Sequence, residues 1–253
     1  MDRLAFNAVA AINEQRVARQ VTANELANVS TPGFKRSYEV AMRAIKVEGP
    51  GLETRLQPQA VSTDVVSMRP GTMMVTGRDL DVAINDKSVL GVSTRDGQLA
   101  FTRRGDLQVT SAGTLQNGSG FVVRGEGGQP ITVPPGSKIN INPDGSIYAT
   151  SDQDMLDPGV LVGRLMLRDA SQSNLVRRED GLFELEGNPG ADITNGTLRP
   201  SLTSKALEGS NVNAMELMIK LMDQSRSFEQ QVRIIKESKT GDEVGASMLK
   251  AGS

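Results

Sequence analysis

The sequence lacks histidine, cysteine and tryptophan altogether, and aromatic residues make up only 3% of its 253 positions. Without cysteine, the chain has no disulfide framework, thiolate metal site or thiol nucleophile. Without histidine, it lacks the commonest metal ligand and the commonest general base near neutral pH. Any catalysis would have to use carboxylates, lysine, serine or tyrosine, so the composition argues against an enzyme.

Charge and hydropathy exclude further classes of partner. The formal net charge is −2, which gives no electrostatic drive toward nucleic acid. No stretch approaches the ~18 consecutive apolar residues of a spanning helix, so we expect no membrane insertion. The start at Met1-Asp2-Arg3 leads into a mixed polar segment rather than a secretory signal. On these grounds alone the chain would be assigned to the cytoplasm.

Both ends of the chain carry amphipathic stretches that predict helices. We expect the first helix from about residue 2 to 28, stopped by Pro32 and Gly33. The second begins near 211–213, where Asn213 and Glu216 have capping-box spacing, and is expected to break at 239–242. Its apolar face is broader than a two-helix seam, which indicates packing against several neighbours. The alternative is a helix that closes the core of its own chain.

These stripes define the side chains that we expect at helical subunit interfaces. The methionines suit irregular surroundings because their side chains adapt to the space available. The expected interface residues are Leu4, Ala8, Ala11, Ile12, Leu26, Asn28, Met215, Met218, Leu221, Met222, Phe228, Val232 and Ile235.

The middle of the chain reads as short β-strands. Strand-like runs follow one another from about residue 73 to 204, separated by turn pairs that supply positive φ. These pairs are Asp96-Gly97, Asn117-Gly118, Asp144-Gly145 and Asp180-Gly181. The sequence therefore predicts an α+β fold: a discontinuous helical domain from 1–35 and 206–253, a connector at 36–72, and a central β domain at 73–205.

Few residues suggest chemistry. Asp79 and Asp81 would share one face of a strand, but no partner acid is evident, so a turn or strand-edge role with Arg78 is favoured. The segment 142–145 fits a hairpin turn better than a calcium loop. The basic pairs 103–104 and 177–178 are interpreted as solvated or at a subunit interface. We find no catalytic arrangement, metal site or cofactor motif.

Two distinctive segments stand near the ends of the chain: Asn24, Leu26, Ala27, Asn28, Ser30, Thr31, Pro32, Gly33 and Phe34 near the start, and Glu208, Gly209, Asn211 and Val212 near the end. Read together, they resemble the signatures of the flagellar basal-body rod and hook family. The middle also contains segments in that family's order, 77–84 with Asp79 where proline is usual, and 101–107.

The resemblance implies a structural protein without cofactors. The terminal helices would pair into a coiled-coil domain inside a tubular rod, with the β domain outside, and the rod would transmit torque from motor to hook in flagellum-dependent motility. Expected partners are other flagellar rod proteins, copies of the chain, and the flagellar type III export apparatus. The expected location is the basal-body rod within the periplasm, reached from the cytoplasm without a cleaved signal peptide.

Within that family, the length and the start of the chain fit a proximal rod subunit. A distal rod or hook-type subunit is the alternative inside the family. Outside it, a carbohydrate-active enzyme would need a carboxylate pair and aromatic residues for sugar stacking, and the latter are scarce. A soluble β-rich binding module would not need amphipathic ends.

Overall fold

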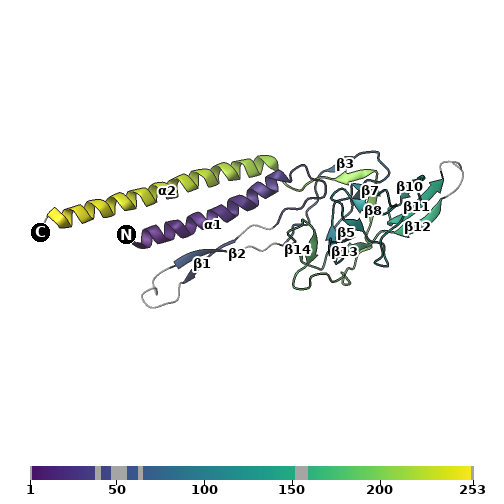
Figure 1. The fold of residues 1–253 in the computed structure, drawn as a ribbon, viewed down its shortest axis with the longest axis horizontal. Helices are drawn as coiled ribbons and strands as arrows, with labels where there is room; N and C mark the ends of the chain where they lie inside the picture. Colours follow the sequence, from purple (N-terminus) through teal and green to yellow (C-terminus); the bar gives the residue numbers. More distant parts are fainter. Residues whose placement is uncertain (1, 38–40, 47–55, 62–64, 152–158, 252–253) are drawn as a thin grey trace. The chain divides into compact units, whose positions relative to one another are not determined.

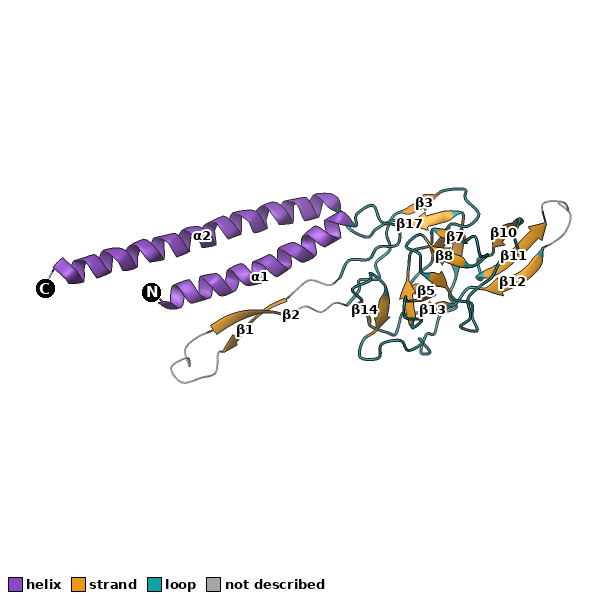
Figure 2. Ribbon diagram, viewed as in Figure 1, coloured by secondary structure: helices purple, strands orange, loops and turns teal. Residues whose placement is uncertain are grey.

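The structure is a computed structural model that describes residues 2–37, 41–46, 56–61, 65–151 and 159–251. It has the predicted α+β architecture, with a long helix near each end and antiparallel strands between (Figures 1 and 2). The chain divides into two compact units. The helical unit comprises Met1–Ala27, Glu39–Thr63 and Asn213–Ser253, and the β body comprises Asn28–Tyr38 and Asp64–Val212.

The two helices are α1, Asp2–Ala27, and α2, Ala214–Ala251. The start of α2 is capped by Asn213, whose Oδ1 accepts hydrogen bonds from the backbone N–H groups of Met215 (3.0 Å) and Glu216 (3.3 Å). The predicted break at 239–242 is wrong, because α2 continues through Gly241. One glycine costs a helix only about 1 kcal/mol, which good helix formers on both sides offset.

Within the helical unit, α1 and α2 run antiparallel and side by side (Figure 1). Polar side chains join them: Gln15 donates to the Ser227 hydroxyl, and Gln224 donates to Thr22 Oγ1 at 3.3 Å. Strands β1, Ala41–Lys46, and β2, Leu56–Val61, form an antiparallel hairpin, and β2 lies against α1. The range predicted as a connector thus contains a hairpin. Neither helix is long and apolar enough, over its described residues, to cross a bilayer.

The β body is built from antiparallel sheets. The largest has the strand order β14-β15-β6-β5-β9-β8-β7, with β13 also paired to β5; a second is β10-β11-β12, and two ribbons are β16-β4 and β17-β3. The strands are β3 Met73–Val75, β4 Val82–Ile84, β5 Ser88–Ser93, β6 Leu99–Thr102, β7 Leu107–Val109, β8 Leu115–Asn117, β9 Val122–Val123, β10 Ser137–Ile141, β11 Ser146–Ser151, β12 Val160–Arg164, β13 Leu167–Asp169, β14 Leu175–Arg177, β15 Phe183–Leu185, β16 Leu202–Ser204 and β17 Ala206–Glu208.

Turn chemistry explains why so many short strands can follow one another. Gly97, Gly145 and Gly181 have φ of 76°, 85° and 81°, as the predicted turn pairs require. In the turn after Asn117, the positive φ falls on Gly120 (84°) rather than on Gly118. Segment 142–145 is a turn, as expected, where Asp144 accepts hydrogen bonds from the backbone N–H (3.1 Å) and hydroxyl (2.7 Å) of Ser146.

Apolar side chains of the β body gather in two buried clusters. One is centred on Val82, Leu90, Leu107, Leu115 and Ile147. The other includes Val66, Val89, Phe101, Leu175 and Phe183. Val66 lies outside the predicted β domain, so the β body uses residues from the start of the chain to complete its core.

Candidate functional site

The two signature segments, far apart in sequence, meet in the β body. The backbone N–H of Gly33 donates to the carbonyl oxygen of Glu208 at 2.7 Å, and the N–H of Asn211 donates to the carbonyl of Phe34 at 3.2 Å. The Asn211 side chain adds three contacts: its Oδ1 accepts from the N–H of Arg36 (2.7 Å), and its Nδ2 donates to the carbonyls of Ser67 (2.9 Å) and Arg69 (3.2 Å). The signature residues therefore tie the exit of α1 to the entry of α2.

Three charged side chains lie buried at this junction, and we call Lys35, Arg103 and Glu208 the clasp. Their exposed fractions are 0%, 2% and 4%. Lys35 Nζ donates to Glu208 Oε1 at 2.7 Å, and Arg103 Nε donates to Glu208 Oε2 at 2.7 Å. One carboxylate thus holds two cations, and neither of its oxygens is left without a partner.

The remaining donors of the clasp bind backbone carbonyls. Lys35 Nζ also donates to the carbonyl of Arg69 at 2.8 Å. Arg103 donates to the carbonyls of Asp86 (2.6 Å) and Ser88 (2.9 Å) and to that of Ile84. Because buried charges are tolerated only when their hydrogen bonds are satisfied, this network makes the burial of three charges possible.

Burial and neighbouring charge shift the pKa values of the clasp. Burial and, to a smaller extent, the nearby Arg103 charge lower the pKa of Lys35 to about 8, although the charge and hydrogen bond of Glu208 partly oppose them. For Glu208, burial alone would raise the pKa. The charges and hydrogen bonds of Arg103 and Lys35 outweigh that effect and leave the pKa of Glu208 below its ordinary value.

The first signature segment folds into a tight turn that leaves no room for larger residues. Thr31 donates to the carbonyl of Asn28 (3.1 Å), Phe34 donates to the carbonyl of Thr31 (3.3 Å), and Gly33 has a φ of 68°. A Cβ on Gly33 would lie 2.3 Å from the carbonyl atoms of Arg103. The glycine is therefore required both by its conformation and by close backbone approach.

Phe34 is the aromatic residue of this turn. The Arg177 guanidinium lies 4.4 Å from the centre of its ring, a cation–π arrangement, and also donates a hydrogen bond to the carbonyl of Lys35. Residues 177–178 were expected to be solvated or at a subunit interface, and Arg177 is instead half-buried against Phe34 and Lys35 of its own chain. Arg103 is the larger correction: it was expected to be solvated or at a subunit interface and is buried in the clasp.

The predicted interface residues fall into two groups on the helices. Leu221, Val232 and Ile235 are half-buried on α2, and Ala11, Ile12, Leu26 and Asn28 are half-buried in and after α1. Met215, Met218, Met222 and Phe228 are exposed, and the side chains of Leu4 and Ala8 lie outside those that the structure describes. Leu217, one helical turn before Leu221, is fully buried.

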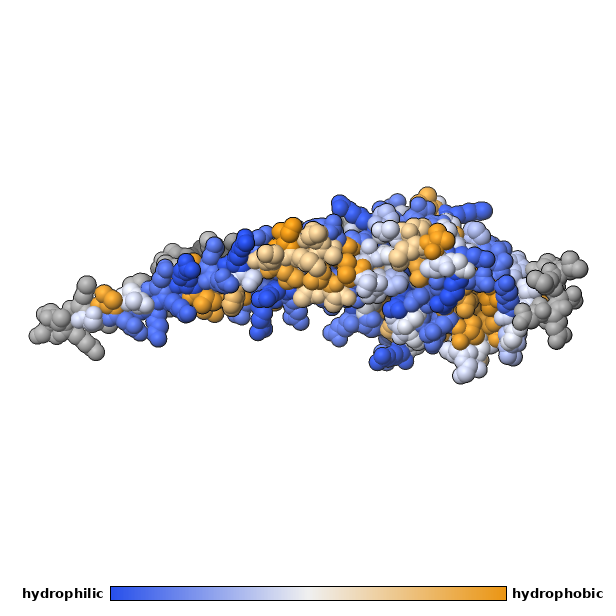
Figure 3. Space-filling view, turned by 90° about the horizontal axis from the view of Figure 1, so that it is seen from above, coloured by the Kyte–Doolittle hydropathy of each residue, from blue (hydrophilic) through white to orange (hydrophobic). Residues whose placement is uncertain are grey.

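The exposed residues form an apolar surface on the first half of α2. Met215, Met218, Ile219 and Met222 are each at least half exposed, between 51% and 69%. In Figure 3 the apolar colours gather over this part of the helical unit. We call these four residues the α2 surface.

The seam between α1 and α2 contains polar side chains besides apolar ones. Thr22 is buried and receives the hydrogen bond from Gln224, and Gln15 reaches Ser227. In the described part of the chain, the amide oxygens of Gln15, Gln224 and Gln231 are buried without a hydrogen-bond partner. The helical unit thus mixes polar groups with apolar side chains such as Leu217 in its buried part and leaves large apolar side chains outside, which is not the pattern of an independently stable helix pair.

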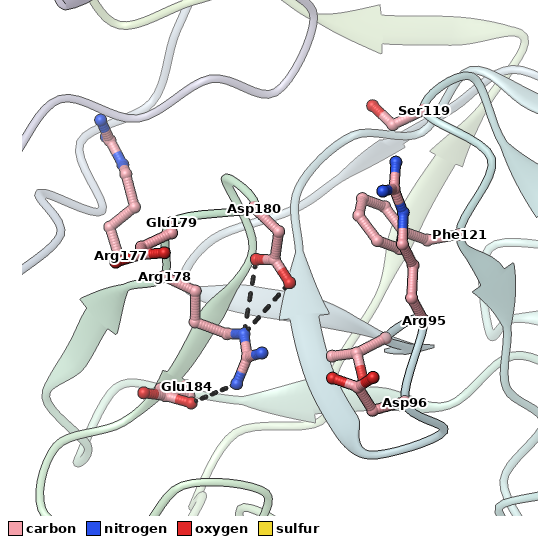
Figure 4. Close-up of a pocket in the computed structure, with 10 residues that line it drawn as sticks. Arg95, Asp96, Ser119, Phe121, Arg177, Arg178, Glu179, Asp180 and Glu184 are labelled. Carbon is pink, nitrogen blue, oxygen red and sulfur yellow. Dashed lines mark hydrogen bonds and ion pairs between the residues drawn. The ribbon is translucent and has the colours of Figure 1, made fainter.

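A cavity of about 810 Å³ opens elsewhere on the β body, and Figure 4 shows its lining. Arg178 lies between Asp180 and Glu184, at 3.3 Å and 2.7 Å, and the hydrogen bond to Glu184 raises the pKa of Arg178. Arg95 extends beside the Phe121 ring on the facing wall (Figure 4). Because Asp180 and Glu184 are both ion-paired to Arg178, they do not form the paired general acid and nucleophile of a glycosidase.

The acidic pair at the start of the β body is structural. Asp81 is buried, and its carboxylate lies 3.5 Å from the Arg78 guanidinium, while Asp79 pairs with Lys205 at 3.0 Å. The expected role with Arg78 is therefore present. Among the described residues, no group of three acidic side chains could hold a metal ion.

Comparison with known families identifies the class of protein. A model of the flagellar hook protein FlgE/F/G D1 domain matches residues 83–149, which lie in the β body. A model of the flagellar basal body rod FlgEFG protein C-terminal region matches residues 203–248, which include Glu208 and most of α2. The chain is thus a flagellar rod or hook type of protein.

Comparison with individual relatives shows which member of this family the chain resembles. The chain is 40% identical over 242 residues to the flagellar basal-body rod protein FlgF of Escherichia coli K12, and 39% identical over 240 residues to that of Salmonella typhimurium, with 93% of each chain covered in both cases. It is 28% identical over 217 residues to FlgF of Buchnera aphidicola, with 85% of each chain covered. The chain belongs to the family of flagellar basal-body rod protein FlgF, and it is a structural subunit of the flagellar basal body rather than an enzyme.

Proposed function

We propose that the chain is a subunit of the proximal rod and that its helical unit is the part that assembles. In this proposal α1 and α2 pair as a coiled coil and pack with the helices of neighbouring rod proteins and of further copies inside a tubular rod. The β body lies outside them. The assembled rod carries torque from the motor to the hook in flagellum-dependent motility.

The observation that carries this proposal is the apolar surface that α2 leaves exposed, together with the unpaired polar groups buried in the helical unit. Burying a Met or Ile side chain contributes about 1.5–3 kcal/mol, so the α2 surface offers a large free energy to any partner that covers it. The buried amide oxygens of the seam each cost about 1–3 kcal/mol when unpaired. A lone helix pair with this pattern is marginal, whereas a pair packed among other helices is stabilised.

The clasp gives the β body its part in this function. Together with the contacts of Gly33 and Asn211 with the opposite signature, it fixes the points where α1 ends and α2 begins. We infer that this anchoring prepares the two helices to pair in one register. A subunit that enters the rod then needs to order fewer residues at the moment of assembly, which reduces the entropic cost of binding.

We further propose that the chain leaves the cytoplasm through the flagellar type III export apparatus and reaches the rod in the periplasm. The absence of cysteine suits a chain that passes through an oxidising compartment while unfolded. A distal rod or hook-type position remains the alternative, and locating the chain in the density of isolated basal bodies would decide between them.

Substitutions on α2 test the proposed assembly surface. Ile219→Asp places a charge where a neighbouring helix would bury it, and we expect loss of swimming in soft agar and loss of the chain from isolated basal bodies. Gln230→Asp makes the same change of charge at an exposed polar position of α2 and should swim normally. Thermal melting of both purified variants should match the unsubstituted chain. Normal swimming of Ile219→Asp would rule out the α2 surface as an assembly interface.

A further inference from the structure

A second cavity of the β body, about 780 Å³ in volume, lies beside the clasp. Its floor is apolar: Val66, Leu175 and Ala170 are buried there, and Leu198 is 56% exposed at its edge. The volume falls within the range of about 300–1,000 Å³ that is usual for binding pockets. We call this cavity the groove.

The rim of the groove carries charged side chains that could form ion pairs with a bound partner. Arg69 and Lys87 line it and are exposed, and neither has an ion-pair partner among the described residues. The Asp86 carboxylate lies on the same rim, so the local net charge is +1. An occupant with apolar side chains flanked by several carboxylates would satisfy both the floor and the rim.

The walls of the groove are held by the clasp. Lys35 binds the carbonyl of Arg69, and Arg103 binds the carbonyls of Asp86 and Ser88 on either side of Lys87. Asp86 is held at a φ of 49°, a left-handed conformation that is uncommon for a residue with a side chain. Because buried charged groups fix both walls, the groove is preorganised, which favours binding.

The same chain carries a complementary element. Val160 and Leu161 on β12 are 68% and 58% exposed. Successive residues of a strand point to opposite faces, so both faces of this part of the β11–β12 hairpin are open to solvent. The residues that join the two strands, 152–158, read Asp-Gln-Asp-Met-Leu-Asp-Pro, with three carboxylates and two large apolar side chains.

We propose that the groove receives the β11–β12 hairpin of a second copy of the chain. This proposal rests on the proposed function, and it adds a contact between β bodies to the packing of the helices. Figure 1 draws β14, which supplies Leu175, and the β11–β12 hairpin at opposite ends of the β body. A contact between two different surfaces is heterologous, and its repetition generates a helical filament rather than a closed pair.

Site-specific cross-linking tests the contact, because the chain has no cysteine of its own. We would introduce Lys87→Cys and Leu161→Cys into one chain, isolate basal bodies and oxidise them. A head-to-tail contact predicts a ladder of covalent dimers and longer products. Each single variant should stay monomeric, and so should Leu161→Cys combined with Val109→Cys, a control on an exposed residue of β7. A double variant that is present in basal bodies and gives no ladder would overturn the proposal.

A charge exchange provides the second measurement and covers variants that fail to incorporate. Lys87→Asp should lower the amount of chain in basal bodies, and the added Asp157→Lys should restore it if the two residues face each other between copies. Lack of restoration, with unchanged thermal melting of both variants, would contradict the contact. If Ile219→Asp blocks assembly while the groove variants assemble normally, the proposed function stands and the second copy in the groove is rejected. Loss of incorporation that only a compensating change in another rod protein restores would identify that protein as the occupant instead.

Discussion

The ammonium group of Lys35 lies 2.7 Å from the carboxylate of Glu208, although 173 positions separate the two residues in the chain. Both are buried, and Arg103 binds the second oxygen of the same carboxylate. The carboxylate is the common partner of both cations, so its removal affects the whole clasp. Substitution of Glu208 should therefore lower the stability of the β body more than substitution of either cation.

Glu208→Gln should destabilise the β body by about 3–5 kcal/mol, because it leaves two buried cations without a counter-charge. Urea denaturation of the purified chain would measure the loss. Glu126→Gln is the matched control: its ion pair with Arg164 is exposed and 3.6 Å long, and its removal should cost less than about 1 kcal/mol. Equal effects of the two substitutions would argue that the clasp contributes little.

The lowered pKa of Lys35 should make the stability of the folded chain depend on pH. Its pKa is about 8 in the folded chain and 10.5 ordinarily, so between these values the unfolded chain binds a proton that the folded chain has lost. The contribution of Lys35 to stability therefore rises with pH across this window and is flat below it. Glu208 has a lowered pKa, so its contribution is present above its ordinary value of 4.5 and is lost as the pH falls through the folded value.

The measurement is the difference in unfolding free energy between the unsubstituted chain and Lys35→Met from pH 7 to 10.5. The groups facing Lys35 are Glu208 and Arg103, with Arg177 bonded to its carbonyl, and they are the same in both proteins except for the lost ammonium. We expect the unfolding free energy of the unsubstituted chain to increase relative to that of Lys35→Met as the pH rises above 8. A falling difference would mean that the ammonium is not destabilised by its burial.

Gly33→Ala should cost far more than an ordinary glycine substitution. The residue has positive φ, and the new Cβ would lie 2.3 Å from backbone atoms that cannot move away freely. Gly120→Ala is a control with positive φ, 84°, and open space around it, so only the conformational cost of about 1–2 kcal/mol applies. Unfolding midpoints in urea would compare them. Similar midpoints would show that the close approach to Arg103 is relaxed in solution.

Two positions on α2 should separate folding from assembly. Phe228 is 42% exposed, so Phe228→Asp should leave the thermal melt of the monomer nearly unchanged and abolish swimming. Leu217 is fully buried, so Leu217→Asp should lower the melting temperature first, because a buried charge costs several kcal/mol. If Phe228→Asp instead unfolds the monomer, the helix packs on its own chain as the alternative interpretation holds.

Fragment boundaries offer a further prediction. Residues 73–205 lack both Lys35 and Glu208, so Arg103 would be buried without its carboxylate, and β3 would lose its partner β17. Residues 28–212 contain all of these groups. We expect cooperative thermal unfolding from the longer fragment and not from the shorter one. Cooperative unfolding of 73–205 would show that the clasp is dispensable for the β body.

The sequence predicts those features whose causes are local. Turn glycines such as Gly97 and Gly145 follow from neighbouring residues, and so do the start of α2 and the stop of α1. The break expected near Gly241 is wrong because the cost of one glycine is small beside the helix-forming residues on both sides of it in α2.

The clasp could not be predicted in this way. Arg103 stands beside Arg104 in what reads as a solvated basic pair, and its acceptors come from residues 84–88 and 208. No pattern in the residues around Arg103, which directly follows β6, indicates that its side chain is buried. Lys35 directly follows the first signature and Glu208 belongs to the second, but only the fold places them together and gives the signatures a structural role.

The clasp also sets an order in time. A ribosome makes Lys35 and Arg103 long before Glu208, so a growing chain carries two cations whose counter-charge does not yet exist. Until that residue emerges, and β17 with it, neither the clasp nor the β3–β17 ribbon can form, because both join segments that are far apart in the sequence. Premature termination anywhere before residue 208 should therefore leave two buried cations without their carboxylate and β3 without its partner strand.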